Sequence, residues 1–186
     1  MRQMAGVLLT GGASSRMGTD KAQLVVRGET LAARSARVLA SVCDPVVEVG
    51  SGVSGLPAVQ EEPPGGGPLV ALLAGVGALG RPRSVILLAC DLPNVSSELL
   101  RLLVEWPGSG TVVPVVEGRF QYACARYGPG ALDEALAAVR TGGSSLKQLA
   151  AADCEYIAES EWGAVATALD FADVDTPEDL RRLGLS

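Results

Sequence analysis

The chain has 186 residues, of which 48% are hydrophobic and 19% charged, and its formal net charge is −6 at pH 7. This length suits a single domain spanning residues 1–186, and the hydrophobic fraction supplies enough side chains for a buried core, which argues against a disordered chain. The acidic balance argues against a general nucleic-acid-binding protein, because such proteins need broad basic surfaces to neutralise phosphates.

Short runs rich in valine, leucine and isoleucine alternate along the chain with segments of helical pattern. In chain order, the predicted strands are Ala5–Leu9, Val46–Val49, Val85–Ala89, Thr111–Val116 and Gln121–Arg126. The predicted helices are Thr30–Val42, Pro68–Leu79, Ser96–Val104, Pro129–Arg140, Ser145–Ala151 and Pro177–Leu183. Apolar strands separated by helices indicate a mainly parallel sheet covered on both faces. We therefore expect an α/β fold, a three-layer sandwich with a Rossmann-like sheet.

Cysteine and histidine usage restricts the chemistry that the chain can perform. The cysteines form no Cys-x-x-Cys pair, which argues against a zinc knuckle or a redox dithiol; they are Cys43, Cys90, Cys124 and Cys154. Cysteines without paired spacing fit reduced thiols, so we expect the protein in the cytoplasm. No apolar run approaches the roughly 20 residues of a membrane span, so we expect no membrane partner. The absence of histidine removes the commonest general base. Carboxylates, lysine, arginine and a metal ion remain, which suits an Mg²⁺-assisted reaction on phosphates.

The segment LLTGGASSRMGTDKA at 8–22 follows the first predicted strand and has the composition of a phosphate-holding loop. Gly11, Gly12 and Gly18 permit tight turns and close approach of the backbone to a ligand. Backbone amides, together with Arg16 and Lys21, supply donors and positive charge for phosphate oxygens. The spacing matches neither a Walker A loop nor the Rossmann Gly-x-Gly-x-x-Gly fingerprint. We expect this loop to bind the phosphates of a nucleotide.

Asp91 follows the predicted strand Val85–Ala89 and precedes Pro93. Ligands of α/β sheets bind beyond the carboxyl ends of the strands, where Asp91 and the glycine loop would both lie. A carboxylate there suits Mg²⁺, a hard cation that prefers oxygen ligands, and we expect Asp91 to bind it. The alternative is an aspartate that only starts a turn before the next helix.

A second acidic segment, QEEPPGGGPL at 60–69, opens the helix predicted from Pro68. Proline suits the first helical position, and the preceding glycines let backbone amides face a ligand. Either Glu61 or Glu62 is a candidate to bind ribose hydroxyls or the water shell of a metal. A flexible surface loop with solvated charges is the alternative.

A third acidic segment, DVDTPEDL at 173–180, begins the last predicted helix. Thr176 is a good N-cap, Pro177 suits the first turn, and Asp179 occupies the capping-box position. Helix initiation does not account for Asp173 and Asp175. In an extended segment these two side chains face the same side, so they are candidates to complete a metal site with Asp91. A solvated strand face is the alternative.

Glu48 is a lone carboxylate inside the predicted strand Val46–Val49. A carboxylate that accepts hydrogen bonds from N1–H and N2–H₂ of guanine would distinguish this base from adenine. The structural alternative is an exposed position on an edge strand. Glu48 is therefore a candidate for base recognition, with both interpretations open.

Five motifs together resemble the MobA-like molybdenum cofactor guanylyltransferases of the nucleotidyltransferase superfamily. They are LTGGASSRMGTDKA (9–22), GGGPL (65–69), CDLP (90–93), VPVVEGRFQ (113–121) and DVDTPEDL (173–180). The resemblance spans nearly the whole chain in the right order. It implies the nucleotidyltransferase fold and transfer of GMP from GTP to Mo-molybdopterin, with Mg²⁺ as cofactor and pyrophosphate as the second product. It also implies transient contact with proteins that supply molybdopterin and with molybdoenzyme chaperones.

The resemblance also assigns roles to individual positions. The nucleotide loop of the family falls on Leu9, Thr10 and Gly11, and Gly12 follows it. The phosphate-binding lysine of the family falls on Lys21, and its metal-binding aspartate falls on Asp91. A nucleotide-contacting acid falls on Glu62, and the guanine-side residue falls near Glu48. The candidate catalytic residues are therefore Arg16, Lys21 and Asp91. The candidate metal ligands are Asp91, Asp173 and Asp175.

The chain departs from the family pattern at several positions. Thr10 stands where alanine is usual, Glu62 where aspartate is common, and Asp173 and Asp175 where asparagines often occur. Ser144 occupies a place where many relatives carry arginine. If that arginine holds the pterin phosphate, Lys147 has to replace it or the acceptor differs.

Two alternative enzymes share the first motif and the aspartate after a strand, namely a cytidylyltransferase for molybdopterin and a sugar-1-phosphate nucleotidyltransferase. A third alternative is a nucleotide- or cofactor-binding protein without catalysis, which only the departures at Ser144 and at 173–175 support. The joint presence of Arg16, Lys21 and Asp91 favours an enzyme over the last of these.

Overall fold

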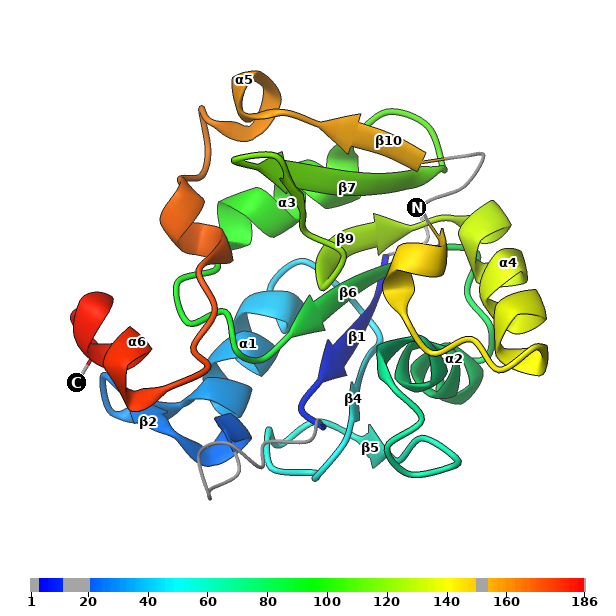
Figure 1. The fold of residues 1–186 in the computed structure, drawn as a ribbon, viewed down its shortest axis with the longest axis horizontal. Helices are drawn as coiled ribbons and strands as arrows, with labels where there is room; N and C mark the ends of the chain where they lie inside the picture. The colour runs from blue at the N-terminus through cyan, green and yellow to red at the C-terminus, as the bar shows by residue number, and fades with distance from the viewer. Residues whose placement is uncertain (1–3, 12–20, 150–153, 186) are drawn as a thin grey trace.

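The computed structural model describes residues 4–11, 21–149 and 154–185. Its main element is an eight-stranded sheet with the order β10-β7-β9-β6-β1-β4-β5, in which β8 pairs with β7 (Figure 1). The strands are β1 Ala5–Leu9, β4 Val46–Val49, β5 Ala58–Val59, β6 Val85–Ala89, β7 Thr111–Val116, β8 Arg119–Phe120, β9 Cys124–Tyr127 and β10 Cys154–Ile157. A separate hairpin joins β2 Val25–Val26 to β3 Glu29–Thr30.

Helices separate most of the strands. They are α1 Leu31–Ala40, α2 Pro68–Ala78, α3 Ser97–Glu105, α4 Pro129–Arg140, α5 Glu159–Trp162 and α6 Pro177–Arg182, with short 3₁₀ turns at η1 Lys21–Gln23, η2 Leu146–Leu149 and η3 Ala168–Phe171. Threonine side chains cap two helix starts, of which the sequence predicts the one at Thr176. Thr30 accepts a hydrogen bond from the Ala33 amide at 3.1 Å, and Thr176 exchanges hydrogen bonds with Asp179 in a capping box. No helix within the described ranges is long and apolar enough to cross a membrane.

Most pairings in the sheet are parallel, as the sequence predicts. β1 lies parallel to both β4 and β6, and β10 lies parallel to β7. The exceptions are β9, which runs antiparallel between β6 and β7, and the short strand β8, which pairs antiparallel with β7. The sheet is therefore mixed, with mainly parallel strands flanked by helices.

Alternate residues of the central strands enter two separate cores. Leu8 and Ile86 pack on the side of α1 and α3, whereas Val7 and Leu87 pack on the side of α2 and α4. These four residues are fully buried. The helices thus cover both faces of the sheet, which gives the expected three layers (Figure 1).

A glycine brings α2 close to the sheet. A Cβ at Gly75 would lie 2.6 Å from Cγ1 of Val7 and 3.1 Å from Cγ2 of Val49, closer than packed carbon atoms approach. Only glycine therefore fits between α2 and the strands β1 and β4. Gly75 lies in the second half of α2, so this contact packs that half of the helix against the middle of β1 and the end of β4.

Two predicted elements differ in the structure. The strand predicted over residues 121–126 is Cys124–Tyr127, because the chain first forms β8 and a turn at residues 121–123. The helix predicted over residues 145–151 is the 3₁₀ turn η2, and its last two residues lie outside the described ranges. The strand β10 was not predicted; two of its side chains are exposed, so it lacks a continuous apolar run.

Arg126 fixes β9 against the loops that follow α3. Its buried guanidinium donates to the carbonyls of Gly110 at 3.0 Å, Trp106 at 2.7 Å and Leu103 at 3.2 Å, and to Pro107 at 3.3 Å. Backbone oxygens thus satisfy a side chain that sequence patterns treat as polar and exposed. This arrangement stabilises the antiparallel strand that separates the two halves of the sheet.

The C-terminal segment returns to the beginning of the chain. Leu180, Leu183 and Leu185 of this segment pack with Val26 and Leu31, so α6 lies beside the β2–β3 hairpin (Figure 1). The amide of Val174 also donates to the carbonyl of Asp91 at 2.9 Å. The acidic segment at 173–175 therefore lies against the end of β6.

Candidate functional site

The strand ends that the sequence predicts to meet lie side by side. The Cys90 amide donates to the Leu9 carbonyl at 3.0 Å, so the segments leaving β6 and β1 are joined by a hydrogen bond. The Gly11 amide donates to the Val49 carbonyl at 3.3 Å, which joins β1 to β4 in the same way. Gly11, Gly50 and Asp91 consequently lie at one edge of the sheet, where α/β proteins bind ligands.

Neighbouring segments hold the backbone around Asp91 in place. The hydroxyl of Ser35 donates to the Cys90 carbonyl at 3.4 Å, and the guanidinium of Arg34 donates to the Pro93 carbonyl. With the bond from Val174, these contacts tie the turn after β6 to α1 and to the C-terminal segment. These contacts fix the position of Asp91. An aspartate that only starts a turn would not need so many of them.

The carboxyl of Asp91 lies in an environment that penalises its charge. Burial and the nearby carboxylate of Asp173 raise its pKa to about 6, Asp175 adds to this effect, and the ammonium of Lys21 opposes it. Four residues that the sequence proposes for phosphate or metal binding therefore lie within electrostatic reach of one another. Asp91 is a carboxylate whose ionised form a cation would stabilise.

Lys21 and Asp175 form an ion pair across the site. The Lys21 side chain is 18% exposed and that of Asp175 is 49% exposed, so the pair borders the solvent. This arrangement departs from the expected metal site, in which Asp175 joins Asp91 and Asp173. The reason is the position of Lys21 after the glycine loop, which offers Asp175 a full positive charge.

The donor set fits a magnesium ion that is held mainly by its substrate. Within the described ranges, no group of three or more acidic, histidine or cysteine side chains is arranged to hold a metal ion. Asp91 and Asp173 nevertheless line one cavity. Mg²⁺ commonly uses one or two carboxylates, with water and substrate phosphates as the other ligands. Asp91 and Asp173 would hold the ion, and Asp175 would remain with Lys21.

A cavity of about 520 Å³ lies between the end of β1 and the start of α2. Its lining residues are Leu9, Gly11, Glu61, Gly65, Gly67, Pro68 and Ala71. Of the two glutamates proposed from sequence, Glu61 faces this space, whereas Glu62 is exposed and is not among the lining residues. The resemblance assigned the contact with the nucleotide to Glu62, whereas the geometry favours Glu61, the other candidate in this segment.

The rim of this cavity is built by the glycine segment before α2. Glu61 accepts a hydrogen bond from the Gly65 amide at 3.1 Å, and the Leu69 amide donates to the Ser144 carbonyl at 3.1 Å. Gly67 has φ 94, and a Cβ there would lie 2.8 Å from the Ser144 carbonyl oxygen. Ser144 therefore contributes to this rim through its backbone.

Glu48 has a structural role that differs from the expected contact with a base. Its side chain is 0% exposed, so it does not occupy an exposed position on an edge strand either. It accepts hydrogen bonds from the amides of Gly52 at 2.7 Å, Val53 at 3.1 Å and Ser54 at 2.9 Å, and from the hydroxyls of Ser54 and Thr10. Both carboxylate oxygens are thus engaged, and neither is free to accept from guanine.

The contacts of Glu48 shape the loop at 50–54, which lies beside Gly11. Although burial alone raises the pKa of Glu48, the hydrogen bonds from Ser54, Thr10 and Val53 outweigh burial and lower it. The loop approaches β1 closely: a Cβ on Gly50 would lie 2.4 Å from the Gly11 amide nitrogen. Thr10 is buried by this contact, so its role is to bind Glu48.

Two predicted residues lie outside the described ranges. Gly12 and Arg16 belong to residues 12–20, so their expected roles in the glycine loop stay predictions. Leu9 and Gly11, which precede these residues, line the cavity between β1 and α2.

A second cavity, of about 480 Å³, begins at Asp91 and extends toward β8. Asp173 and Phe171 line it together with Arg119, Phe120, Gln121, Tyr122 and Lys147. It therefore contains the proposed metal ligands Asp91 and Asp173, two cations and three aromatic rings. The sequence named Lys147 only as the residue that has to replace the missing arginine at Ser144 if that arginine holds the pterin phosphate. It gave no functional signal for Phe120 beyond its place in the motif at 113–121, and none for Tyr122, which lies outside that motif.

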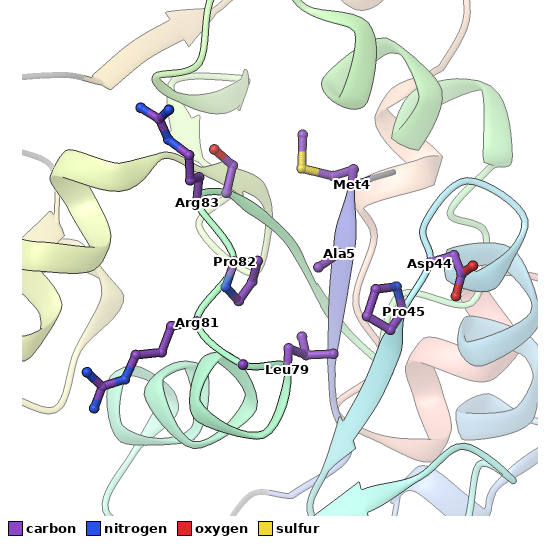
Figure 2. Close-up of a pocket in the computed structure, with 10 residues that line it drawn as sticks. Met4, Ala5, Asp44, Pro45, Leu79, Arg81, Pro82 and Arg83 are labelled. Carbon is purple, nitrogen blue, oxygen red and sulfur yellow. The ribbon is translucent and has the colours of Figure 1, made fainter. Parts of the chain in front are cut away.

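A third cavity, of about 530 Å³, lies at the opposite, amino-terminal edge of the central strands. Figure 2 shows Met4, Pro45, Leu79 and Pro82 around Ala5, with the guanidinium groups of Arg81 and Arg83 on the side away from β1. Its single acid is Asp44. This cavity lacks the paired carboxylates of the carboxyl edge, so it is a weaker candidate for phosphate and metal chemistry.

Comparison with known proteins places the chain in a family. A family model described as the MobA-like NTP transferase domain matches residues 6–160. A probable molybdenum cofactor guanylyltransferase of Opitutus terrae is 37% identical, over 80% of this chain and 78% of its own length. Another protein with this name, from Pelotomaculum thermopropionicum, is 33% identical over 97% of this chain and 91% of its own length.

Solved structures share the fold. Molybdopterin-guanine dinucleotide biosynthesis protein A of Archaeoglobus fulgidus superposes with a TM-score of 0.77 at 23% identity, covering 97% of this chain and 96% of its own. The 4-diphosphocytidyl-2C-methyl-D-erythritol synthase of Anaerococcus prevotii superposes with a TM-score of 0.70 at 11% identity, covering 98% and 94%. At such identities the structures establish the fold, and the sequence match establishes the family. The chain belongs to the MobA-like NTP transferase family and is a nucleotidyltransferase.

Proposed function

We propose that this enzyme transfers GMP from GTP to Mo-molybdopterin and releases pyrophosphate, with Mg²⁺ as its cofactor. The observation that carries the proposal is the convergence of Lys21, Asp91 and Asp173 at the carboxyl edge of the sheet. Two cavities open at this edge, one beside β1 and one beside β6, which are adjacent strands. Curated relatives named for guanylyl transfer to the molybdenum cofactor support the choice of substrates.

The two cavities divide the substrates between them. GTP occupies the cavity beside β1, where Leu9 and Gly11 contact the nucleotide and Glu61 accepts hydrogen bonds from ribose hydroxyls. The acceptor occupies the cavity of Asp91. The α-phosphate then lies at the junction between the cavities, close to the ends of β1 and β6. Such placement converts the encounter of two substrates into a reaction within one complex.

The reaction is an in-line displacement at the α-phosphorus of GTP. An oxygen of the terminal phosphate of molybdopterin forms a bond to this phosphorus, and the bond from the phosphorus to the β-phosphate oxygen breaks. The bonding electrons leave with pyrophosphate. The attacking oxygen is already anionic, so no general base is needed, which suits a chain without histidine.

Positive charge must balance the phosphate oxygens as they gather in the site. Mg²⁺ supplies charge neutralisation between the phosphates when it is bound by Asp91 and Asp173. Lys21 exchanges its contact with Asp175 for the triphosphate, and Arg16 adds a second cation from the glycine loop. Their ammonium and guanidinium groups stabilise charge that grows on the leaving pyrophosphate.

Glu48 acts on base recognition indirectly in this proposal. Its hydrogen bonds fix the loop 50–54 beside Gly11, and the backbone of this loop contacts the base side of the nucleotide. Guanine selection over cytosine then depends on backbone groups. A preference for CTP would instead assign the enzyme to cytidylyl transfer on the same fold.

The test measures pyrophosphate release by purified enzyme with GTP, Mg²⁺ and Mo-molybdopterin, and repeats it with CTP, ATP and UTP. We expect release with GTP, dependence on Mg²⁺, and a loss of at least about 100-fold in kcat for Asp91→Ala and Lys21→Ala, since each removes charge stabilisation from the transition state. Asp44→Ala and Arg83→Ala are matched controls, because both residues are exposed at the opposite edge of the sheet. Full activity of folded Asp91→Ala would overturn the metal assignment.

Further outcomes separate the alternatives. Turnover of sugar 1-phosphates in place of molybdopterin would assign the acceptor to another class. Tight binding of GTP with no product from any acceptor would indicate a nucleotide-binding protein without catalysis. Isothermal titration of the nucleotide panel, with and without Mg²⁺, gives the base preference independently of the acceptor.

A further inference from the structure

The cavity beside Asp91 has one wall made by a tight hairpin. β7 and β8 pair antiparallel, with Val115 opposite Phe120 and Val116 opposite Arg119. The connecting residues Glu117 and Gly118 have φ 48 and φ 76, the backbone that a two-residue hairpin of this twist requires. The hairpin therefore holds Arg119 and Phe120 at a fixed place in the cavity wall.

Aromatic side chains gather on this wall. The ring of Phe120 lies 5.8 Å from that of Tyr122 and 4.6 Å from that of Tyr156, in tilted arrangements. Phe120 is nevertheless 47% exposed, and both Phe120 and Tyr122 line the cavity. A large apolar ring held by aromatic neighbours but left open to a cavity offers a face on which a flat ligand ring can stack.

Charges of opposite sign accompany this aromatic wall. Arg119 and Lys147 reach the cavity from β8 and η2, elements 28 positions apart in the chain, and both side chains are exposed. Asp91 and Asp173 line the same cavity. A ligand that fits this set carries negative charge for the two cations and reaches a metal ion near the two carboxylates.

We propose that Phe120, Arg119 and Lys147 form the acceptor subsite, which binds a phosphomonoester attached to a flat heterocyclic ring. The ring stacks on Phe120 beside Tyr122. Arg119 and Lys147 neutralise the negative charge of the acceptor and direct its phosphate to the junction with the nucleotide cavity. This inference rests on the proposed transfer to molybdopterin, which has both chemical features, and it names the residues that select the acceptor.

Two features distinguish this subsite from the site for GTP. The nucleotide cavity beside β1 contains Glu61 and a glycine rim but no aromatic side chain among its lining residues. The cavity of Asp91 contains three aromatic rings, of Phe120, Tyr122 and Phe171, and two cations. Changes to Phe120, Arg119 and Lys147 should therefore alter the use of the acceptor and leave the binding of GTP unchanged.

The test compares steady-state kinetics of Phe120→Leu, Phe120→Trp and the double variant Arg119→Ala/Lys147→Ala, with Mo-molybdopterin varied at saturating GTP. We expect Phe120→Leu, which keeps an apolar side chain but loses the aromatic face, to raise the KM for the acceptor ~10-fold. Phe120→Trp should restore the KM to within about twofold, because it keeps the stacking surface. The double variant should raise the KM by at least about 10-fold and make it less sensitive to salt.

Leu136→Ala and Arg140→Ala serve as matched controls, since both residues are exposed on α4 and line neither cavity. GTP affinity by calorimetry and the melting temperature should be unchanged in every variant. An unchanged acceptor KM in Phe120→Leu and in the double variant, with active wild-type enzyme, would overturn the subsite. A wild-type enzyme that binds GTP but does not use molybdopterin would instead overturn the proposed function, so the two failures are distinguishable.

Discussion

Replacing Glu48 by glutamine tests whether this carboxylate is a structural anchor. Its Oε1 accepts from the Gly52 and Val53 amides and the Thr10 hydroxyl, and its Oε2 accepts from the amide and hydroxyl of Ser54. In Glu48→Gln, one acceptor becomes an NH₂ donor that faces other donors, whichever way the amide is turned. The variant therefore loses hydrogen bonds and also leaves buried donors unpaired.

The expected cost follows from the bonds affected. A hydrogen bond to a charged group contributes about 1.5–3 kcal/mol, and a buried group left unpaired costs about 1–3 kcal/mol. Because Gly50 and Gly52 are flexible, the loop can relax and regain part of the free energy that is lost with these hydrogen bonds. We expect Glu48→Gln to lower the free energy of unfolding by about 2–4 kcal/mol at pH 7.

The same variant has a defined pH dependence. The pKa of Glu48 is lower in the folded protein than in the unfolded chain, so near these values the unfolded chain binds more protons. The stabilisation is fully present above the unfolded pKa and is lost as the pH falls through the folded pKa. The difference between wild type and Glu48→Gln should therefore shrink as the pH falls through this acidic range.

Urea unfolding, followed by circular dichroism at pH values from neutral to acidic, measures these differences. Glu105→Gln is the control, since Glu105 is exposed at the end of α3 and its loss should change stability by less than about 0.5 kcal/mol. If Glu48→Gln unfolds with the wild-type midpoint at pH 7, the carboxylate does not stabilise the loop. A large fall in GTP affinity without any loss of stability would return Glu48 to direct contact with the base.

Two further substitutions test the packing of the sheet. Gly75→Ala should destabilise the protein by about 1–3 kcal/mol, because its Cβ would overlap Val7. Gly77→Ala on the same helix is the control; its Cβ meets nothing within 4 Å, so it should be neutral or stabilising by up to about 1 kcal/mol. Equal melting temperatures of the two variants would refute the close contact at Gly75. Arg126→Met should lower the free energy of unfolding in urea by about 2–4 kcal/mol, because it leaves the carbonyls of Trp106 and Gly110 without this donor. Arg101→Met, at an exposed position, is the control. An equally small effect of both substitutions would refute the structural role of Arg126.

The central strands and the longer helices were predictable from local patterns. β1, β4, β6 and β7 begin and end where the apolar runs do, because each strand is buried and hydrogen-bonded on both sides or covered by helices. Helix α4 likewise matches its predicted bounds, with Pro129 at its start. Short edge elements such as β10 were not predictable, because their half-exposed side chains depend on a partner strand that lies far away in sequence.

The candidate site was predictable in its location and less so in its contacts. The position of Asp91 and of the glycine loop at the carboxyl ends of strands could be predicted, and Asp173 was a candidate to join them; in the structure Lys21 and Asp173 lie within electrostatic reach of Asp91. The pairing of Lys21 with Asp175 and the burial of Glu48 could not be predicted, because both depend on loops whose paths are set by tertiary contacts. The choice between Glu61 and Glu62 likewise required knowing which way the strand turns after β5.

The antiparallel strand β9 explains why two cavities open at one edge. A parallel strand beside β6 would need a helical crossover, whereas β7 returns through the short β8 hairpin and enters β9 directly. The carboxyl end of β7 thus carries Arg119 and Phe120 beside Asp91, without a helix between them. On the other side of Asp91, the end of β1 and the start of α2 border the cavity in which we propose that GTP binds. The reversal of strand direction beside β6 therefore separates the proposed donor and acceptor while keeping both next to Asp91, the proposed metal ligand.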